Sequence, residues 1–201
     1  MARSEGAVSP IGEITYGIFL EKTRDGASCD AMEDPPPIRR KVVMLGPPAT
    51  GKTALLTRYV AGAAPEAYLS SVGLKVDQVR VPGTVPPLEL LLWDLSGGLP
   101  LDALPPYYLA GCHGYLYVID LSRPETFRRL RRQRRCLSRL LPACPGLIVG
   151  NKRDLLSPRR LATLQRRLSP RVSHFVSAAS GHAVADPFAH LPRLLLPGGS
   201  I

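Results

Sequence analysis

The chain lacks the features that would place it within a membrane or outside the cell. None of its apolar runs approaches the ~18 residues that a membrane-spanning helix needs. Its first ten residues, MARSEGAVSP, contain no apolar core of the kind that a secretory signal requires. Its four cysteines form no C-x-x-C pair, so neither a zinc knuckle nor a small disulfide scaffold is indicated. These absences favour a cytoplasmic protein with reduced thiols, and partners could bring it to the periphery of membranes.

Acidic residues and lysine are both scarce. The 201 residues include 26 bases and 16 acids, which gives a net charge of +10, and only five of the bases are lysine. Residues 1–40 carry −2, so the remainder carries +12. Two explanations stay open. A GC-rich gene would enrich arginine together with alanine, proline and glycine, whereas an excess of arginine would also attract phosphates, anionic lipids or nucleic acid.

The composition and the hydrophobic pattern of the chain change near residue 40. Residues 1–39 are rich in Gly, Ser, Asp and Glu, which predicts an N-terminal extension that is largely flexible. From 40 to 201, short apolar runs alternate with helical patterns, which indicates a single α/β domain with a mostly parallel sheet. The expected strands are 41–45, 74–81, 88–93, 115–119, 147–149 and 172–176, and the clearest helices are 52–61 and 124–141.

The strongest motif is GPPATGKT at 46–53, which fits the phosphate-binding pattern G-x-x-x-x-G-K-[ST] between an expected strand and an expected helix. In such a loop, backbone N–H groups at a helix N-terminus bind phosphate oxygens. Lys52 would reach the β- and γ-phosphates, and the Thr53 hydroxyl would ligate Mg²⁺. Pro47 and Pro48 have no N–H to contribute. The expected nucleotide-binding positions of this loop are Gly46, Ala49, Thr50, Gly51, Lys52, Thr53 and Ala54.

A carboxylate follows the expected strand 88–93. Asp94 opens a D-x-x-G tetrad that ends at Gly97. At the carboxyl end of a buried strand beside the phosphate loop, Asp94 would hold Mg²⁺ and the Gly97 N–H would face a γ-phosphate. Such tetrads are common, so the weight of this one comes from its place after the strand.

A third motif selects the base. The stretch 151–154, Asn-Lys-Arg-Asp, matches N-K-x-D and follows the expected strand 147–149. Asp154 can accept two hydrogen bonds from the guanine N1–H and exocyclic amine, a pair of donors that adenine lacks. Asn151 can bridge loops, and the stem of Lys152 can cover the face of the ring. A backbone N–H after the last expected strand could meet guanine O6, and the candidates are Ser177, Ala178 and Ala179.

In this order the motifs resemble the Ras superfamily of small GTPases. The detail is most similar to the Rab and Rab-like branch, in YYLAGCHGYLYVIDLSRPETF at 107–127 and YLSSVGL at 68–74. The resemblance implies a P-loop NTPase G domain that binds GTP and GDP with Mg²⁺. It also implies a six-stranded mixed sheet with helices on both faces and one antiparallel edge strand. By the same resemblance, Ser71 takes the switch position that ligates Mg²⁺ and caps the γ-phosphate.

The chain also departs from this family pattern. Gly98 occupies the position of the catalytic glutamine and cannot orient an attacking water, so no catalytic residue is assigned. No cysteine follows Cys144, so no prenyl anchor is expected. The last helical pattern, 184–196, contains Pro187 and Pro192 and is expected to be broken there.

The stretch 124–141 contains seven arginines. At helical spacing, Phe127, Leu130, Leu137 and Leu140 would line a packed side and the arginines a solvated side. This solvated side is either an ordinary helix surface or, over residues 128–139, a site for an acidic partner or an anionic membrane. A nucleic-acid reader fits less well, because no aromatic residues alternate with the arginines.

Three functional hypotheses follow. The first is a Rab-like switch in intracellular or vesicle transport and signalling, a weak GTPase that hydrolyses GTP slowly unless a partner helps. Its effectors and regulators would bind the segments near Ser71 and at 97–107, which respond to the γ-phosphate. The alternative is a GTP-binding pseudoGTPase scaffold with negligible turnover. The third, a P-loop kinase or ATPase, is disfavoured by the N-K-x-D match at 151–154.

Overall fold

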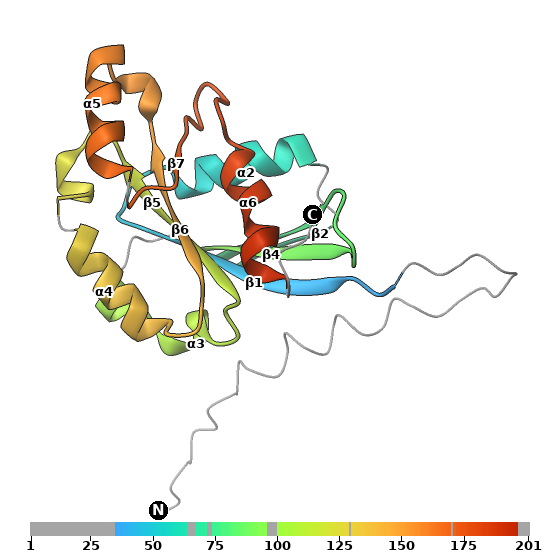
Figure 1. Ribbon diagram of the computed structural model, residues 1–201. Coiled ribbons are helices and arrows are strands. Elements are labelled where there is room, and N and C mark those ends of the chain that lie inside the picture. The colour runs from blue at the N-terminus through green and yellow to red at the C-terminus, as the bar shows by residue number, and fades with distance from the viewer. Residues whose placement is uncertain are drawn as a thin grey trace, which may run out of the picture. The chain divides into compact units, whose positions relative to one another are not determined.

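The computed structural model describes residues 35–63, 67–71, 74–95, 100–128, 130–169 and 171–196 (Figure 1). Its strands are β1 (Ile38–Leu45), β2 (Ala67–Ser71), β3 (Leu74–Val81), β4 (Leu88–Leu95), β5 (Gly114–Asp120), β6 (Gly146–Asn151) and β7 (His174–Phe175). Its α-helices are α2 (Lys52–Ala63), α3 (Pro106–Leu109), α4 (Leu130–Leu140), α5 (Pro158–Leu168) and α6 (Asp186–Leu195). Short 3₁₀ turns are η1 (Leu101–Ala103), η2 (Pro124–Thr126) and η3 (Arg153–Leu155). Most of the expected extension, residues 1–34, lies outside the described residues.

The described strands form one mixed sheet in the order β2-β3-β4-β1-β5-β6-β7. The pairs from β4 through β1 and β5 to β7 are parallel, whereas β3 is antiparallel to β4 and β2 is antiparallel to β3. The expected α/β fold with a mixed sheet is therefore confirmed. Each of the six expected strands is present, and β2 adds a seventh in the described part of the chain. Its five residues show too short an alternation to be recognised in the sequence.

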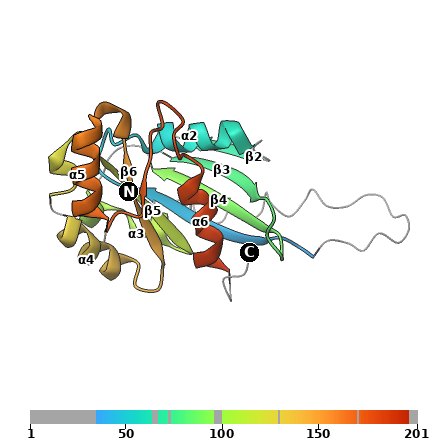
Figure 2. The same ribbon diagram turned by 45° about the horizontal axis from the view of Figure 1, so that its top comes forward.

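Alternate residues of the central strand β1 face opposite sides of the sheet. Val42 and Met44 join the core under α2 and α6, whereas Val43 and Leu45 join the core under α4 and α5. Figures 1 and 2 show these two pairs of helices on opposite sides of the sheet. A strand buried on both faces reads as a continuous apolar run, which is why KVVML stands out in the sequence. The helices therefore cover both faces, as expected.

Two expected helices differ in detail. The stretch 124–141 divides into η2 and α4. Phe127, Leu130 and Leu137 are buried as expected, but Leu140 is 36% exposed, because it lies at the end of α4, where the helix leaves the sheet. The last helix is not broken at its prolines, because α6 continues through Pro192. Pro187 lies in the first turn of α6, where a missing N–H breaks no helical hydrogen bond. Pro192 removes one bond, but it is buried beside Phe188 and Leu191, and this packing offsets the loss.

The helix ends follow ordinary local rules. Pro158 opens α5 at a position that needs no N–H, and the preceding Ser157 accepts a hydrogen bond from the Arg160 N–H at 3.4 Å. In the described ranges, no helix is both long and apolar enough to cross a bilayer.

Candidate functional site

The loop between β1 and α2 has a backbone that few residues can adopt. Gly46 has a φ of 136°, and a Cβ there would collide with the carbonyl oxygen of Val118. Gly51 has a φ of 89°, and a Cβ there would collide with the side-chain amide of Asn151. Ala49 also has a positive φ, 57°, which is uncommon for a residue with a side chain. These turns wrap the loop around the N-terminus of α2, where unpaired N–H groups favour an anion.

The ammonium group of Lys52 is folded back across this loop. Its Nζ donates to the carbonyl oxygens of Gly46 at 3.0 Å and Pro47 at 3.1 Å, and the residue is only 8% exposed. Burial lowers the pKa of Lys52, and the nearby charge of Asp94 opposes that shift. A largely desolvated positive charge is therefore held at the loop, where an anion can displace the two carbonyl oxygens.

Asp94 lies beside this loop near the end of β4, in register with Met44 of β1. It is 1% exposed, and within the described residues neither of its carboxylate oxygens has a hydrogen-bond donor. A buried carboxylate without donors is costly unless a cation balances it. Thr53 is exposed in the first turn of α2 and supplies a hydroxyl oxygen. Carboxylate and hydroxyl oxygens are ligands that suit a hard cation such as Mg²⁺.

The N-K-x-D motif is hydrogen-bonded to the loop between β1 and α2. The Asn151 amide donates to the carbonyl oxygen of Thr50 at 3.0 Å and accepts from the Ala178 N–H at 3.0 Å. The Ser177 hydroxyl donates to the carboxylate of Asp154 at 2.5 Å. Asn151 and Ser177 are both buried, while Asp154 is exposed. The motif that would read a base is thus fastened to the loop that would bind phosphates.

A second carboxylate, Asp120 at the end of β5, strengthens this connection. It forms ion pairs with Lys152 Nζ at 2.8 Å and Arg123 Nε at 2.9 Å. Lys152 also donates to the carbonyl oxygen of Ala49 at 2.8 Å, and Arg123 donates to that of Pro48 at 2.9 Å. Burial alone would raise the pKa of Asp120. Hydrogen bonds from Lys152, Ser122 and Arg123 outweigh burial and lower the pKa to about 2.

Asp120 was not identified in the sequence, although a signal for it exists. It ends a buried apolar strand, as Asp94 nearly does, and the same reasoning would have selected it. Its partners are close only because the carboxyl ends of parallel strands meet at one edge of the sheet.

The other predicted residues are placed as follows. Ala54 is exposed in the first turn of α2, and Ala179 is exposed in the turn after β7. Ser71 ends β2 and pairs with Leu74, although its side chain is not among those described. Gly97 and Gly98 lie outside the described residues, so their predicted roles depend on the sequence alone.

Comparison with known proteins assigns the chain to a family. The Ras family model matches residues 41–195. The chain belongs to the Ras family. GTP-binding protein rho1 of Schizosaccharomyces pombe is 33% identical over 153 residues, which cover 74% of this chain and 72% of the relative. Ras-related protein Rab-21 of Geodia cydonium is 29% identical over 164 residues, which cover 79% of this chain and 72% of the relative.

Membership of the Ras family has a direct functional consequence. The expected resemblance to the Ras superfamily is confirmed, and this Ras-family chain is a GTP-binding switch protein that has diverged from its relatives. The matches include both Rho-named and Rab-named proteins, among them Ras-related protein Rab-1A of Dictyostelium discoideum, 28% identical over 124 residues and 59% of each chain.

Proposed function

We propose that this Ras-family protein is a Rab-like switch that binds GTP and GDP with Mg²⁺, hydrolyses GTP slowly and acts in intracellular or vesicle transport. Its G domain would span residues 40–201, of which the family match covers 41–195. One observation carries the guanine assignment. Asp154 is oriented by Ser177, and the same motif is bonded through Asn151 to the phosphate loop. A base and a phosphate chain joined by a ribose would connect these two points.

The phosphate end of the site would be formed by the loop and Lys52. The N–H groups from Ala49 to Ala54 follow the two prolines and surround the start of α2. An incoming β- or γ-phosphate would replace the carbonyl oxygens that Lys52 now contacts at 3.0 and 3.1 Å. The charge-assisted bonds that result would be stronger than the bonds they replace.

For Mg²⁺ we assign Thr53, Asp94 and Ser71. Asp94 provides the main support, because its buried carboxylate lacks a donor within the described residues and lies near Lys52. Ser71 is assigned to this role from its position in the sequence. When bound, Mg²⁺ would neutralise negative charge on the phosphate oxygens.

Two segments would report the state of the nucleotide, one near Ser71 and one over residues 97–107. In the second segment, Tyr107 is 65% exposed in α3, and its ring lies 4.4 Å from that of Tyr108. Exposed aromatic side chains are enriched in protein interfaces, which suits contact with effectors and regulators.

Nucleotide competition tests the guanine assignment. GTP and GDP should displace labelled GDP from the purified chain, whereas ATP should not. Asp154→Ala should weaken GTP binding by about 1–3 kcal/mol, because the guanine donors lose a charged acceptor. Asp186→Ala, which removes an exposed carboxylate on α6, is the matched control and should have no effect. Equal competition by ATP and GTP would show that the base assignment is wrong.

Single-turnover hydrolysis separates the switch from the pseudoGTPase alternative. Phosphate release from GTP-loaded protein should be slow, because Gly98 offers no side chain to position water. Gly98→Gln should accelerate release by about tenfold or more, equivalent to about 1.4 kcal/mol or more of barrier. Tight GTP binding without turnover in either protein would favour the scaffold. A wild-type rate typical of glutamine-bearing relatives, with no gain in the variant, would place catalysis in other residues.

A further inference from the structure

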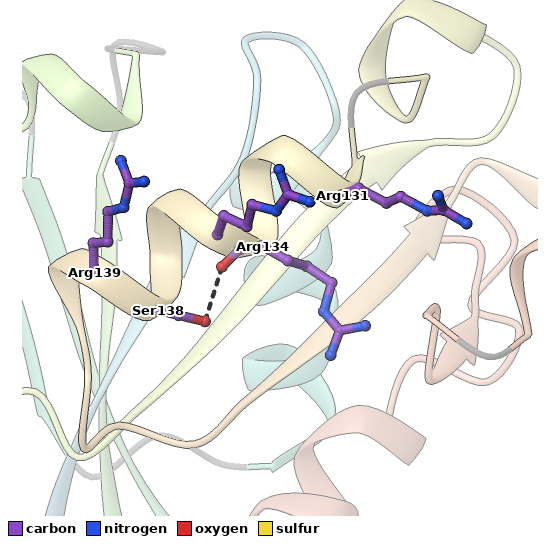
Figure 3. A pocket seen from close by; sticks show the side chains of 5 residues that line it. Arg131, Arg134, Ser138 and Arg139 are labelled. Atoms are coloured by element: carbon purple, nitrogen blue, oxygen red, sulfur yellow. Dashed lines mark hydrogen bonds between the residues drawn. The ribbon is translucent and has the colours of Figure 1, made fainter.

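Two helices of the domain present only positive charge to solvent. α4 reads LRRQRRCLSRL, and its exposed arginines are Arg131, Arg132, Arg134, Arg135 and Arg139. α5 reads PRRLATLQRRL, and its exposed arginines are Arg159, Arg160, Arg166 and Arg167. Neither helix contains Asp or Glu. Arg131, Arg134 and Arg139 line an open hollow. Figure 3 shows their side chains extending from α4 in different directions, with the Ser138 hydroxyl donating a hydrogen bond to the Arg134 carbonyl oxygen.

The two helices lie on the same side of the sheet. Leu130 and Leu137 of α4 and Leu164 and Leu168 of α5 are buried in one apolar cluster. Figures 1 and 2 both show α4 and α5 over this side. Because the apolar sides of both helices are buried there, their arginine sides point away from the sheet. We call the outer sides of these two helices, with their nine arginines, the α4–α5 face.

The charge of the α4–α5 face is not neutralised within the described part of the chain. Across those residues, none of the nine arginines forms an ion pair with a carboxylate. Arg135 is four residues from both Arg131 and Arg139, a spacing at which like charges destabilise a helix. Packing against the sheet needs only the leucines, so the fold does not require this density of charge. The α4–α5 face is therefore suited to an anionic partner.

We propose that the α4–α5 face docks on the anionic surface of a lipid bilayer. A flat polyanion can engage the arginines of both helices at once, and guanidinium groups bind phosphate through paired hydrogen bonds. A protein partner would require apolar anchors at its centre, yet Leu140, 36% exposed, is the only large exposed apolar residue in the two helices. Neither helix contains an aromatic residue on which a nucleic-acid base could stack.

This contact goes beyond nucleotide binding. The phosphate loop lies at the carboxyl end of β1, and β2 and β3 form the edge of the sheet remote from β6 and β7. The α4–α5 face is built from neither. Docking through charge alone, without insertion of apolar side chains, is reversible and weakens steeply with salt.

Vesicle sedimentation with the full chain tests the proposal. The protein should pellet with phosphatidylcholine vesicles that contain about 30% phosphatidylserine and not with phosphatidylcholine alone, and pelleting should fall between about 50 mM and about 300 mM salt. Equal pelleting with both kinds of vesicle would overturn the proposal. The proposal would also be overturned if the protein bound an acidic peptide or an RNA but did not pellet with the anionic vesicles, because the face would then bind another partner.

Matched variants locate the contact. Arg131→Gln with Arg135→Gln should weaken binding to the anionic vesicles by at least about tenfold. Arg58→Gln with Arg193→Gln removes the same charge from exposed positions on α2 and α6, on the other side of the sheet, and should weaken binding less than about twofold. Equal losses would show that net charge rather than the α4–α5 face drives binding. Arg159→Gln with Arg166→Gln, on α5, repeats the test if the α4 variant unfolds.

Discussion

Replacing Asp120 by asparagine removes a charge that holds two loops together. In the folded chain the pKa of Asp120 is about 2, against 3.8 for an ordinary aspartate. A difference of roughly two pKa units corresponds to about 2.5 kcal/mol. Its partners Lys152 and Arg123 are 31% and 38% exposed, so water screens part of this interaction. We expect Asp120→Asn to lower the free energy of unfolding at neutral pH by about 1–2 kcal/mol.

The dependence on pH distinguishes charge from packing. Because the folded pKa is depressed, the stabilisation is fully present above about pH 5 and is lost as pH falls toward about 2. The stability difference between wild type and Asp120→Asn should therefore shrink to roughly half near pH 3. Urea unfolding followed by the fluorescence of Trp93, the single tryptophan, measures it.

A matched control comes from the same network. Glu125 lies 4.0 Å from Arg123 and its side chain is 67% exposed, so Glu125→Gln should leave stability unchanged. A constant difference between wild type and Asp120→Asn from pH 7 to pH 3 would refute the electrostatic explanation. It would mean that the variant acts through lost shape or hydrogen bonding alone.

Two further predictions concern the phosphate loop. Lys52→Ala should abolish retention of GTP through purification, measured by mass spectrometry of bound nucleotide. Lys41→Ala should not, because the Lys41 Nζ donates to the carbonyl oxygen of Ala110 rather than to the loop. Retention by Lys52→Ala would contradict the loop assignment. Gly51→Ala should release nucleotide faster, because the new methyl group would displace the Asn151 amide. Gly83 also has a positive φ but has open space around it, so Gly83→Ala controls for backbone strain. Equal effects of the two variants would show that the Asn151 contact has no role in nucleotide retention.

The candidate site could be proposed from the sequence because the loop at 46–53, Asp94 and the N-K-x-D motif each depend on a few neighbouring residues at fixed spacing. The strands were predictable for a similar reason, since β1 and β5 are buried on both faces and read as apolar runs. The two-residue strand β7 was located only approximately, within 172–176.

Features that depend on distant contacts were not predictable. The pairing of Asp120 with Lys152 joins the ends of β5 and β6, and no sequence spacing encodes it. The continuation of α6 through Pro192 depends on burial, which local propensity does not contain. The arginines of α4 were noticed in the sequence. Those of α5 could be assigned to the same cationic face only from the structure, in which the two helices cover the same side of the sheet.

Lys52 loses its contact with water when the chain folds, not when a ligand binds. Its ammonium group leaves bulk water as the chain folds, and two loop carbonyls take the place of solvent before any ligand arrives. The lowered pKa of Lys52 reflects that unfavourable transfer. An arriving phosphate therefore meets a cation already stripped of its hydration shell, and more of the attraction between them appears as affinity. Burial of this charge lowers the stability of the empty protein. A ligand that binds the folded chain should raise its thermal midpoint by mass action.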